Sequence, residues 1–463
     1  MFKKLMSCLV LAIATILLAV GCNSDTRLQN DEVTKSPSET NVLQIWWDKG
    51  YNIQEDEILQ QIVSNWQQES GEKAKIKFYK ADDIAQKTRR AIQAGNPPDI
   101  LFSSRAEYPL LAWQGKLEDV SEVIEPVEQF YTSAAKKAAY LYNNIAKKLS
   151  YYSVPLHQGT IHIFYWKDLL AGIGKEASDI PRSWDEFWQF WQEAQSKFQQ
   201  EKQQNVNVYA LGLPFSVKAS DTYYLFEQIL EAYNVTILDA ENKLTVDNPN
   251  VRQGIIDCLK WYSEFFQQGY VPPSALTWLD PDNNREFLNR NVLMTPNPTL
   301  SIATALLEDQ EVYAKDLGTM EFPNKPDGNP MRHIVSVRQA VILAEAKNKQ
   351  IAKEFLIYFI QPEIINNYLK SAGGRYLPAL TTVTKDSFWT NSQDLHISTA
   401  TKTLTNEGQT RLFYSVQDPI YSSVLEENLW GQALNSIALN KISPEEAADK
   451  AIAQIKKIFA EWE

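Results

Sequence analysis

Apolar positions early in the chain switch between the spacing of strands and the spacing of helices. Residues 41–47 (NVLQIWW) have the character of a buried strand, and residues 55–71 carry apolar side chains at helical spacing and end in Gly71. Residues 74–81 alternate as a second strand, and after another helical stretch the turn GNPP leads into a third strand at 99–102. This β-α-β-α-β order predicts a largely parallel sheet covered by helices.

Two later helices have clear N-terminal signals. In PRSWDEFWQFW, Ser183 caps the helix and Glu186 completes a capping box, and Ser443 and Glu446 do the same near the C-terminus. We interpret the aromatic and apolar stripes that follow as core packing. No internal repeat and no Pro- or Ser-rich linker interrupts residues 42–463. Two lobes would therefore be joined by strands, and a short strand-built hinge permits closure around a ligand.

The N-terminal segment predicts export. Lys3 and Lys4 precede a short apolar run, LVLAIATILLAV, so residues 1–21 are predicted to be a signal peptide. The residues before Cys22 (LAVG) resemble a bacterial lipobox, which implies acylation of Cys22 and a lipid anchor. The alternative is a simple secretory leader with an incidental cysteine. Residues 22–41 are polar and are predicted to form a tether that spans roughly 25 Å.

Length, charge and cysteine content narrow the possible functions. The 463 residues suggest two or three domain-sized units. A formal net charge of −12 argues against binding nucleic acid or a membrane surface through a basic patch. With Cys8 in the leader and Cys22 acylated, only Cys258 remains, so we expect no disulfide and a buried thiol on a helix. Abundant aromatic residues offer ring faces on which sugars pack.

Signatures of enzymes and metal sites are missing from the sequence. It contains no G-x-S-x-G, no H-E-x-x-H, no P-loop and no Cys-x-x-Cys. The four histidines, His157, His162, His333 and His396, lack the spacing of metal ligands. Carboxylates are plentiful but cannot be paired from sequence, so a glycosidase pair is neither shown nor excluded. We expect no enzymatic activity, no cofactor and no metal.

Seven segments, in order, carry a family resemblance. They are IWWDKGYN, GNPPDIL, YSVPLHQGTIHIFYWKDLL, PRSWDEF, TWLDPDNNREFLNRNVLMTPNPT, AKNKQIAKEFLIYFIQPE and ISPEEAADKA. Together they resemble the extracellular solute-binding protein family 1 of ABC importers, in the branch that includes maltose-binding protein. Trp166 stands where that family usually has an asparagine, and Ser103 stands where it has an aromatic residue. The second replacement argues against ring stacking at this loop.

The resemblance implies an α/β fold of the type II periplasmic-binding-protein class. It consists of two α/β lobes with a strand-built hinge and a ligand cleft between them. By analogy, residues 42–157 and 292–340 form the first lobe, and residues 158–291 and 341–463 form the second. The resemblance also implies a monomer that captures a carbohydrate, delivers it to the membrane subunits of an ABC importer, and is lipid-anchored on the periplasmic or cell-surface side of the membrane.

Candidate ligand-binding residues follow from two arguments. Ligands of open α/β sheets bind at the carboxyl ends of strands, which selects the loops after the predicted strands. The family resemblance adds an Asp-Lys pair that contacts sugar hydroxyls, matched here by Asp48 and Lys49; a solvated turn is the alternative for this loop. Only one of Trp46 and Trp47 is expected to reach the cleft, and His157 is either a ligand contact or a structural residue. The candidates are Trp47, Asp48, Lys49, Tyr51, Ser103, Ser104, Arg105, Glu107, His157, Gln158, Phe215, Lys218, Trp278, Asp280, Asn283, Asn297, Gly374, Arg375, Tyr376 and Trp430.

Two other functions remain open at this point. A secreted glycoside-acting enzyme would need a catalytic pair that no motif supplies. A metal- or polyamine-binding protein on the same fold could use the adjacent tyrosines Tyr151-Tyr152 or Tyr223-Tyr224, which we interpret more simply as core aromatics. Carbohydrate capture is the leading hypothesis, and the specific sugar is not predicted.

Overall fold

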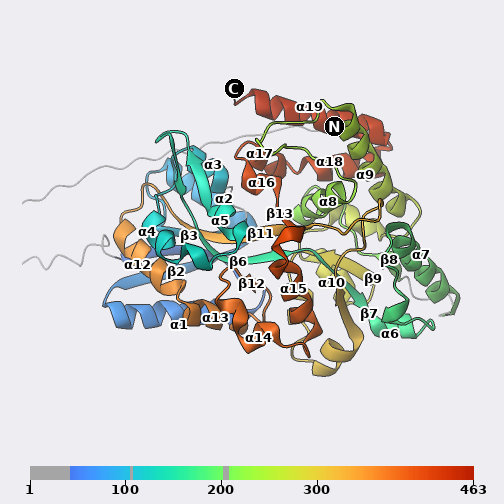
Figure 1. The fold of residues 1–463 in the computed structure, drawn as a ribbon, viewed down its shortest axis with the longest axis horizontal. Helices are drawn as coiled ribbons and strands as arrows, with labels where there is room; N and C mark the ends of the chain where they lie inside the picture. The colour runs from blue at the N-terminus through green and yellow to red at the C-terminus, as the bar shows by residue number, and fades with distance from the viewer. Residues whose placement is uncertain (1–41, 105–107, 202–207, 463) are drawn as a thin grey trace, which may run out of the picture. The chain divides into compact units, whose positions relative to one another are not determined.

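The computed structural model describes residues 42–104, 108–201 and 208–462, which belong to one compact unit (Figure 1). Its larger sheet has seven strands in the order β12-β6-β11-β3-β1-β2, with β13 also paired to β11. These strands are β1 (Val42–Asp48), β2 (Lys73–Tyr79), β3 (Ile100–Phe102), β6 (Val154–Thr160), β11 (His333–Ile342), β12 (Leu377–Pro378) and β13 (Thr410–Leu412). A separate hairpin consists of β4 (Tyr140–Asn143) and β5 (Lys148–Tyr151).

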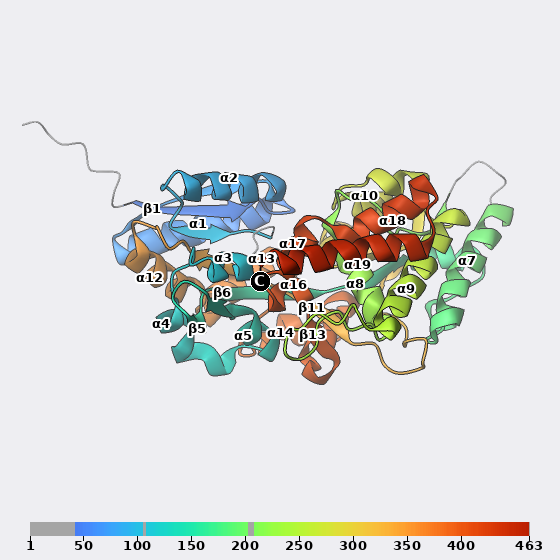
Figure 2. The same ribbon diagram turned by 90° about the horizontal axis from the view of Figure 1, so that it is seen from above.

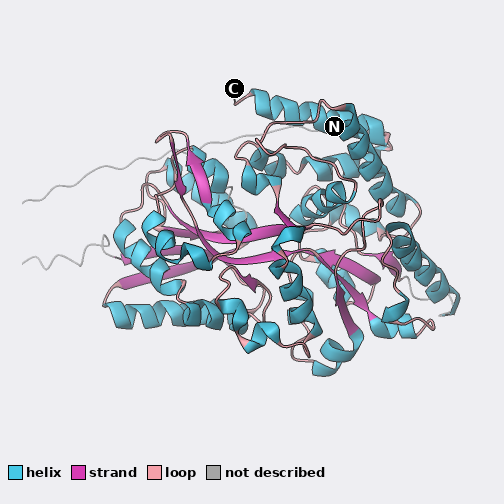
Figure 3. Cartoon of the chain, in the orientation of Figure 1, coloured by secondary structure: helices cyan, strands magenta, loops and turns pink. Residues whose placement is uncertain are grey.

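A second sheet of four strands lies in the other half of the unit (Figure 3). Its order is β10-β7-β9-β8, with β7 (His162–Trp166), β8 (Tyr209–Leu211), β9 (Val292–Asn297) and β10 (Leu317–Met320). The buried apolar side chains likewise form two clusters, one around each sheet. The two lobes expected from the sequence are therefore present.

The first lobe forms as the alternation of its sequence predicts. Along β1 the buried positions are every second residue, and β1 pairs in parallel with both β2 and β3. The connecting helix α1 begins where Asn52 accepts a hydrogen bond from the Glu55 backbone N–H at 3.0 Å and ends at Gly71, which has a φ of 76°. The helices around this sheet are α1 (Ile53–Ser70), α2 (Ala81–Gln93), α3 (Tyr108–Trp113), α4 (Ser121–Ile124), α5 (Ser133–Ala139), α12 (Lys349–Phe359) and α13 (Pro362–Ser371).

Helices surround the second sheet. They are α6 (Lys167–Ala171), α7 (Trp184–Glu201), α8 (Ser220–Ala232), α9 (Pro249–Gln267), α16 (Tyr414–Gln417), α17 (Tyr421–Glu426), α18 (Leu429–Asn440) and α19 (Pro444–Ala460), and the longest of them are α7, α9 and α19. Ser443 caps α19 as predicted, accepting a hydrogen bond from the Glu446 N–H at 3.2 Å. The predicted aromatic stripe of α7 lies in the core, and Cys258 is buried on α9. The remaining helices are α10 (Asp282–Leu288), α11 (Ser301–Thr304), α14 (Ser387–Thr390) and α15 (Leu395–Thr405).

Continuous strands join the two lobes. Strand β6 of the first sheet and β7 of the second are separated only by Ile161. Strand β11 runs antiparallel to β6, and its first residues pair with β13. The sequence predicted such a strand-built hinge. In the part of the chain that the structure describes, no helix combines the length and the apolar character needed to cross a bilayer.

Strands β9 and β10 were expected in the first lobe but belong to the second sheet, and α12, α13 and β12 were expected in the second lobe but lie in the first. Strand β9 pairs with β7 and β8 in the second sheet, where Leu293 and Met294 join the buried cluster of the second lobe. Helices α12 and α13 pack in the first lobe, where Phe355 contacts Trp66 with ring centroids 5.2 Å apart and Phe359 contacts Trp47 at 5.6 Å. The apolar face of α12 is therefore matched to aromatic residues of the first lobe, which no pattern within α12 alone could indicate.

Candidate ligand-binding site

A cavity of about 230 Å³ lies between the two lobes. The first lobe contributes α2, α3 and the residues after β3, the second contributes α8, α16 and α17, and β11 crosses between them. Hydroxyl groups and aromatic rings dominate the wall: Ser103, Ser104, Tyr108, Tyr224, Ser336, Phe413, Ser415 and Ser422. This combination can donate to and accept from hydroxyl groups while covering the apolar face of a ring.

A smaller cavity of about 100 Å³ adjoins the first, because Ser104 and Arg338 line both. Five of the residues predicted from loops around β1 and α13 line it, together with Glu55 from α1. They are Trp47, Asp48, Lys49, Arg375 and Tyr376. The structure therefore brings the Asp-Lys pair and the Gly-Gly-Arg-Tyr loop to one place, although they are more than 300 residues apart in the sequence.

The peptide group of Ser104 lies between two opposite charges. Its N–H donates to Asp48 Oδ2, and its carbonyl accepts from Arg338 Nη1 at 3.0 Å. Burial alone would lower the pKa of Arg338, but Tyr224, Tyr376 and Asp48 raise the pKa above the ordinary value of an arginine. Arg338 therefore presents a permanent cation to both cavities.

Arg375 and three aromatic rings form a stack beside the smaller cavity. The guanidinium carbon lies 5.1 Å from the centre of the Tyr51 ring and 4.5 Å from that of Tyr376, and Nη1 pairs with both oxygens of Glu55 at 3.0 and 3.1 Å. The His157 ring stacks on Tyr376 with centroids 3.9 Å apart. Burial raises the pKa of Tyr376 to about 12. The stack holds Tyr376 against the cavity.

His157 itself lies behind the cavity wall. Its side chain is fully buried, and burial, followed by the charges of Arg338 and Arg375, lowers its pKa well below the ordinary value. The imidazole therefore stays neutral and supports Tyr376 by packing. Of the two adjacent tryptophans, Trp47 is buried, lines the smaller cavity and stacks on Phe102 with ring centroids 4.4 Å apart. Trp46 is half-buried and packs against Tyr79.

Two contacts join the lobes beside the larger cavity. Arg89 Nη1 of α2 pairs with Glu426 Oε1 of α17 at 2.9 Å. Trp113 of α3 packs against Trp462, just after α19, with ring centroids 4.6 Å apart. Helix α19 runs along the second lobe toward the first (Figure 2). Both contacts depend on the lobes lying close together.

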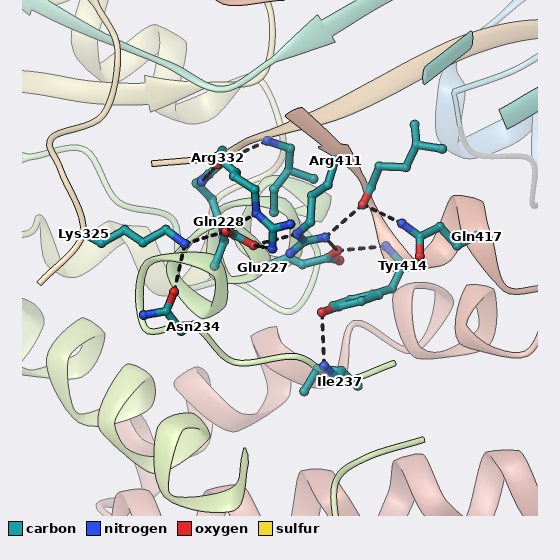
Figure 4. Close-up of polar contacts among 12 residues, drawn as sticks. Glu227, Gln228, Asn234, Ile237, Lys325, Arg332, Arg411, Tyr414 and Gln417 are labelled. Carbon is teal, nitrogen blue, oxygen red and sulfur yellow. Dashed lines mark hydrogen bonds and ion pairs between the residues drawn. The ribbon is translucent and has the colours of Figure 1, made fainter. Parts of the chain in front are cut away.

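A buried charge cluster fixes α8, which carries Tyr224, to the strands of the hinge (Figure 4). Glu231 accepts from Lys325 Nζ at 2.8 Å, from Arg332 Nε at 2.7 Å and from Arg411 Nε at 2.9 Å. Glu227, one turn earlier, accepts from Arg411 Nη1 at 3.1 Å. Burial alone would raise the pKa of Glu231, but these cations lower it to about 2. The cluster therefore holds a carboxylate in its charged form where α8 meets β13 and the start of β11.

Several predicted residues of the second lobe lie away from both cavities. Trp278 is buried and donates to Ser274 Oγ at 3.1 Å, while Phe215 and Trp430 are fully buried in the core. Asp280 accepts from the N-terminal residues of α8, and Lys218 is exposed. Trp278 and Trp430 therefore lie in the core of this lobe and line neither cavity.

Other predicted residues support the crossing segments. Asn283 donates to Asn297 Oδ1 at 3.2 Å, and Gln158 donates to the Pro378 carbonyl at 3.1 Å. Gly374 adopts a φ of 71°, and a Cβ there would lie 2.4 Å from Ile397 Cδ1, so only glycine fits this turn. Arg105, Glu107 and Cys22 lie outside the described residues.

Cavity residues in the middle of a strand or helix were not predicted from the sequence. Ser336 and Arg338 lie on β11, and Tyr224 lies on α8. The rule that ligands bind at strand ends directs attention to loops only. A usable signal was Arg338, a charge within the otherwise apolar run HIVSVRQAVI. Of the Tyr223-Tyr224 pair, Tyr223 is core as interpreted, but Tyr224 lines the cavity.

Solved structures similar to this one share its fold. An ABC transporter solute-binding protein from Thermotoga lettingae bound with alpha-D-tagatose is 21% identical, with a TM-score of 0.75, over 90% of this chain and 99% of that chain. Maltose-bound MalE3 of T. maritima is 16% identical, with a TM-score of 0.73, over 90% and 100%. A sugar transporter from Arthrobacter chlorophenolicus with bound laminaribiose is 13% identical, with a TM-score of 0.70, over 90% and 99%.

The architecture is therefore that of the type II periplasmic sugar-binding proteins, as the sequence predicted. A comparison with curated protein sequences found no significant match. The model of the bacterial extracellular solute-binding protein family matches residues 51–366, which is more than half of the chain. The chain belongs to the bacterial extracellular solute-binding protein family.

Proposed function

We propose that the protein is the substrate-binding component of an ABC sugar importer and captures a mono- or oligosaccharide or a glucosyl-polyol by closure of its lobes. The observation that carries this proposal is the cavity between the lobes, walled by serine hydroxyls and the rings of Tyr108, Tyr224 and Phe413. A polyhydroxylated ligand needs this pairing of hydrogen-bonding groups with ring faces. The sugars named for the similar structures are of the same class.

A thermal-shift screen over sugars and polyols tests the proposal. A ligand that binds only the folded protein stabilises it by about 2.7 kcal/mol at 100 times its Kd. We expect one group of sugars to raise the melting temperature of the wild type. Tyr224→Ala removes a ring from the cavity wall and should shrink that shift. Tyr142→Ala, on the exposed face of the β4–β5 hairpin, should leave it unchanged. No shift with any carbohydrate would contradict the proposal.

We further propose binding without chemical conversion of the sugar. Incubation of the protein with a panel of glycosides, followed by analysis for released sugars, separates this proposal from the enzyme alternative. We expect the glycosides to be recovered intact. Turnover above the background rate would show a glycoside-acting enzyme.

The N-terminal segment leads to a proposal about location. Residues 1–21 would direct export, and acylation of Cys22 would anchor the protein on the outer side of the cell membrane. The tether would let the anchored monomer diffuse near the importer. Cys22→Ser is expected to move the protein from the membrane fraction to the soluble exported fraction, measured by fractionation and immunoblotting. Cys258→Ser serves as the control, because that thiol is buried in the second lobe. Retention of the Cys22→Ser protein in the membrane fraction would contradict lipid anchoring.

A further inference from the structure

The charges that line the two adjoining cavities do not cancel among the described residues. The cations are Lys49, Arg89, Arg338 and Arg375, and the anions are Asp48, Glu55 and Glu426. The cavity lining therefore carries one more cation than anions, in a protein whose formal net charge is −12. A local excess of positive charge in an acidic protein favours an anionic ligand.

Four of these seven charged groups form two ion pairs. Glu55 is paired with Arg375, and Glu426 with Arg89. Lys49 is exposed, at the edge of the smaller cavity. Among the described residues, Arg338 makes no ion pair with a carboxylate and donates to the Ser104 carbonyl. Arg338 therefore lines both cavities without contacting a described carboxylate, and the nearest described anion, Asp48, is held on the other side of the Ser104 peptide group.

The position of Arg338 suits recognition of a ligand. It lies on β11, the strand that crosses between the lobes, and it lines both cavities. Arg338 is half-buried, and a guanidinium binds the planar fork of a carboxylate or the oxygens of a phosphate through two parallel hydrogen bonds. The hydroxyl-rich wall around it would hold the rest of a sugar.

We infer that the ligand is a sugar bearing one anionic group, and that Arg338 binds this group. The inference rests on the proposed function and specifies the class of sugar. A carboxylate, as in a uronic acid, and a phosphate ester present the same chemistry to a guanidinium. Neutral sugars would bind through the hydroxyls and rings alone.

Calorimetric titration of the wild type with D-glucose, D-glucuronate and D-glucose 6-phosphate tests the inference. We expect at least one of the two anionic sugars to bind at least tenfold more tightly than glucose, and the stronger of them identifies carboxylate or phosphate as the preferred group. Arg338→Gln should remove this preference, and Arg338→Lys, which keeps the charge without the fork, should restore part of it. Arg285→Gln, at an exposed arginine paired with Asp282, should retain the preference in full.

The outcomes separate this inference from the proposed function. Equal affinity for neutral sugars and their anionic analogues would overturn the anionic-sugar inference. So would a preference that persists in Arg338→Gln, provided that the melting temperature of the unliganded variant shows that it is folded. In both cases the proposal of sugar capture would stand. If no carbohydrate of any charge binds the wild type, both fail.

Discussion

Replacement of Glu231 by alanine will lower the free energy of unfolding by about 3–5 kcal/mol, because it leaves buried cations without their carboxylate. Lys325, Arg332 and Arg411 all donate to this side chain, and Lys325 and Glu231 are almost fully buried. Arg411 keeps Glu227 as a partner, whereas the Lys325 ammonium keeps, among the described side chains, the amide oxygen of Asn234. Chemical denaturation monitored by circular dichroism measures the change.

The control for this variant is a carboxylate in an exposed pair. Glu311 and Lys315 are spaced i,i+4, and both are more than 70% exposed. Glu311→Ala should change the free energy of unfolding by less than about 0.5 kcal/mol, since exposed pairs contribute little. A similar small loss for Glu231→Ala would mean that the charge cluster does not stabilise the fold.

The same carboxylate predicts how the stability of the wild type depends on pH. Its pKa is about 2 in the folded protein, against 4.5 for an ordinary glutamate. The ionised form therefore stabilises the fold fully above pH 4.5, and this contribution is lost as the pH falls from 4.5 toward 2. Because Glu231→Ala has no carboxylate to titrate, its stability should decline less over this interval than that of the wild type.

Replacement of Trp462 by alanine will weaken ligand binding by roughly 5- to 30-fold while leaving the unliganded melting temperature nearly unchanged. The ring packs on Trp113 of the other lobe, and an aromatic pair contributes about 1–2 kcal/mol including buried area. Because the contact exists only with the lobes together, its loss shifts the equilibrium toward the open form and lowers the apparent affinity by the same free energy. Titration with whichever sugar the thermal screen identifies gives the measurement.

A second contact provides an internal comparison. Arg89→Ala removes the ion pair with Glu426 across the lobes and should weaken binding two- to fivefold, since exposed pairs contribute up to about 1 kcal/mol. Arg252 makes a similarly exposed pair with Asp449, but both residues belong to the second lobe. Arg252→Ala should therefore not change the affinity. Equal effects of Arg89→Ala and Arg252→Ala would show that these contacts do not control closure.

The sequence predicted the fold where a pattern is local. The alternation along β1, the helical spacing of α1 and the cap at Ser443 each depend on neighbouring residues, and the structure confirms all three. The placement of β9 and α12 was not predictable in this way. Which sheet an apolar strand joins, and which aromatic residues a helix meets, depend on partners that are distant in the sequence.

In the candidate site, too, residues selected by local rules were predicted and residues placed by tertiary packing were not. Asp48 and Lys49, at the carboxyl end of β1, were predicted from a rule of fold geometry, and they line one cavity. Trp278 and Trp430 were also predicted, but both are buried in the core of the second lobe and line neither cavity. Arg338 and Tyr224 escaped because side chains in the middle of a strand or helix reach a cavity only through tertiary packing.

The single residue Ile161 between β6 and β7 has a consequence for measuring occupancy. Rotation about so short a join displaces each point of the second lobe in proportion to its distance from the join, as with a lever. Helix α7 lies at the outer side of that lobe, on the side away from the first lobe (Figure 1). A pair of dyes, one on α7 and one on α1, would therefore report ligand through a larger change in separation than any probe beside the cavity, and would leave its wall untouched.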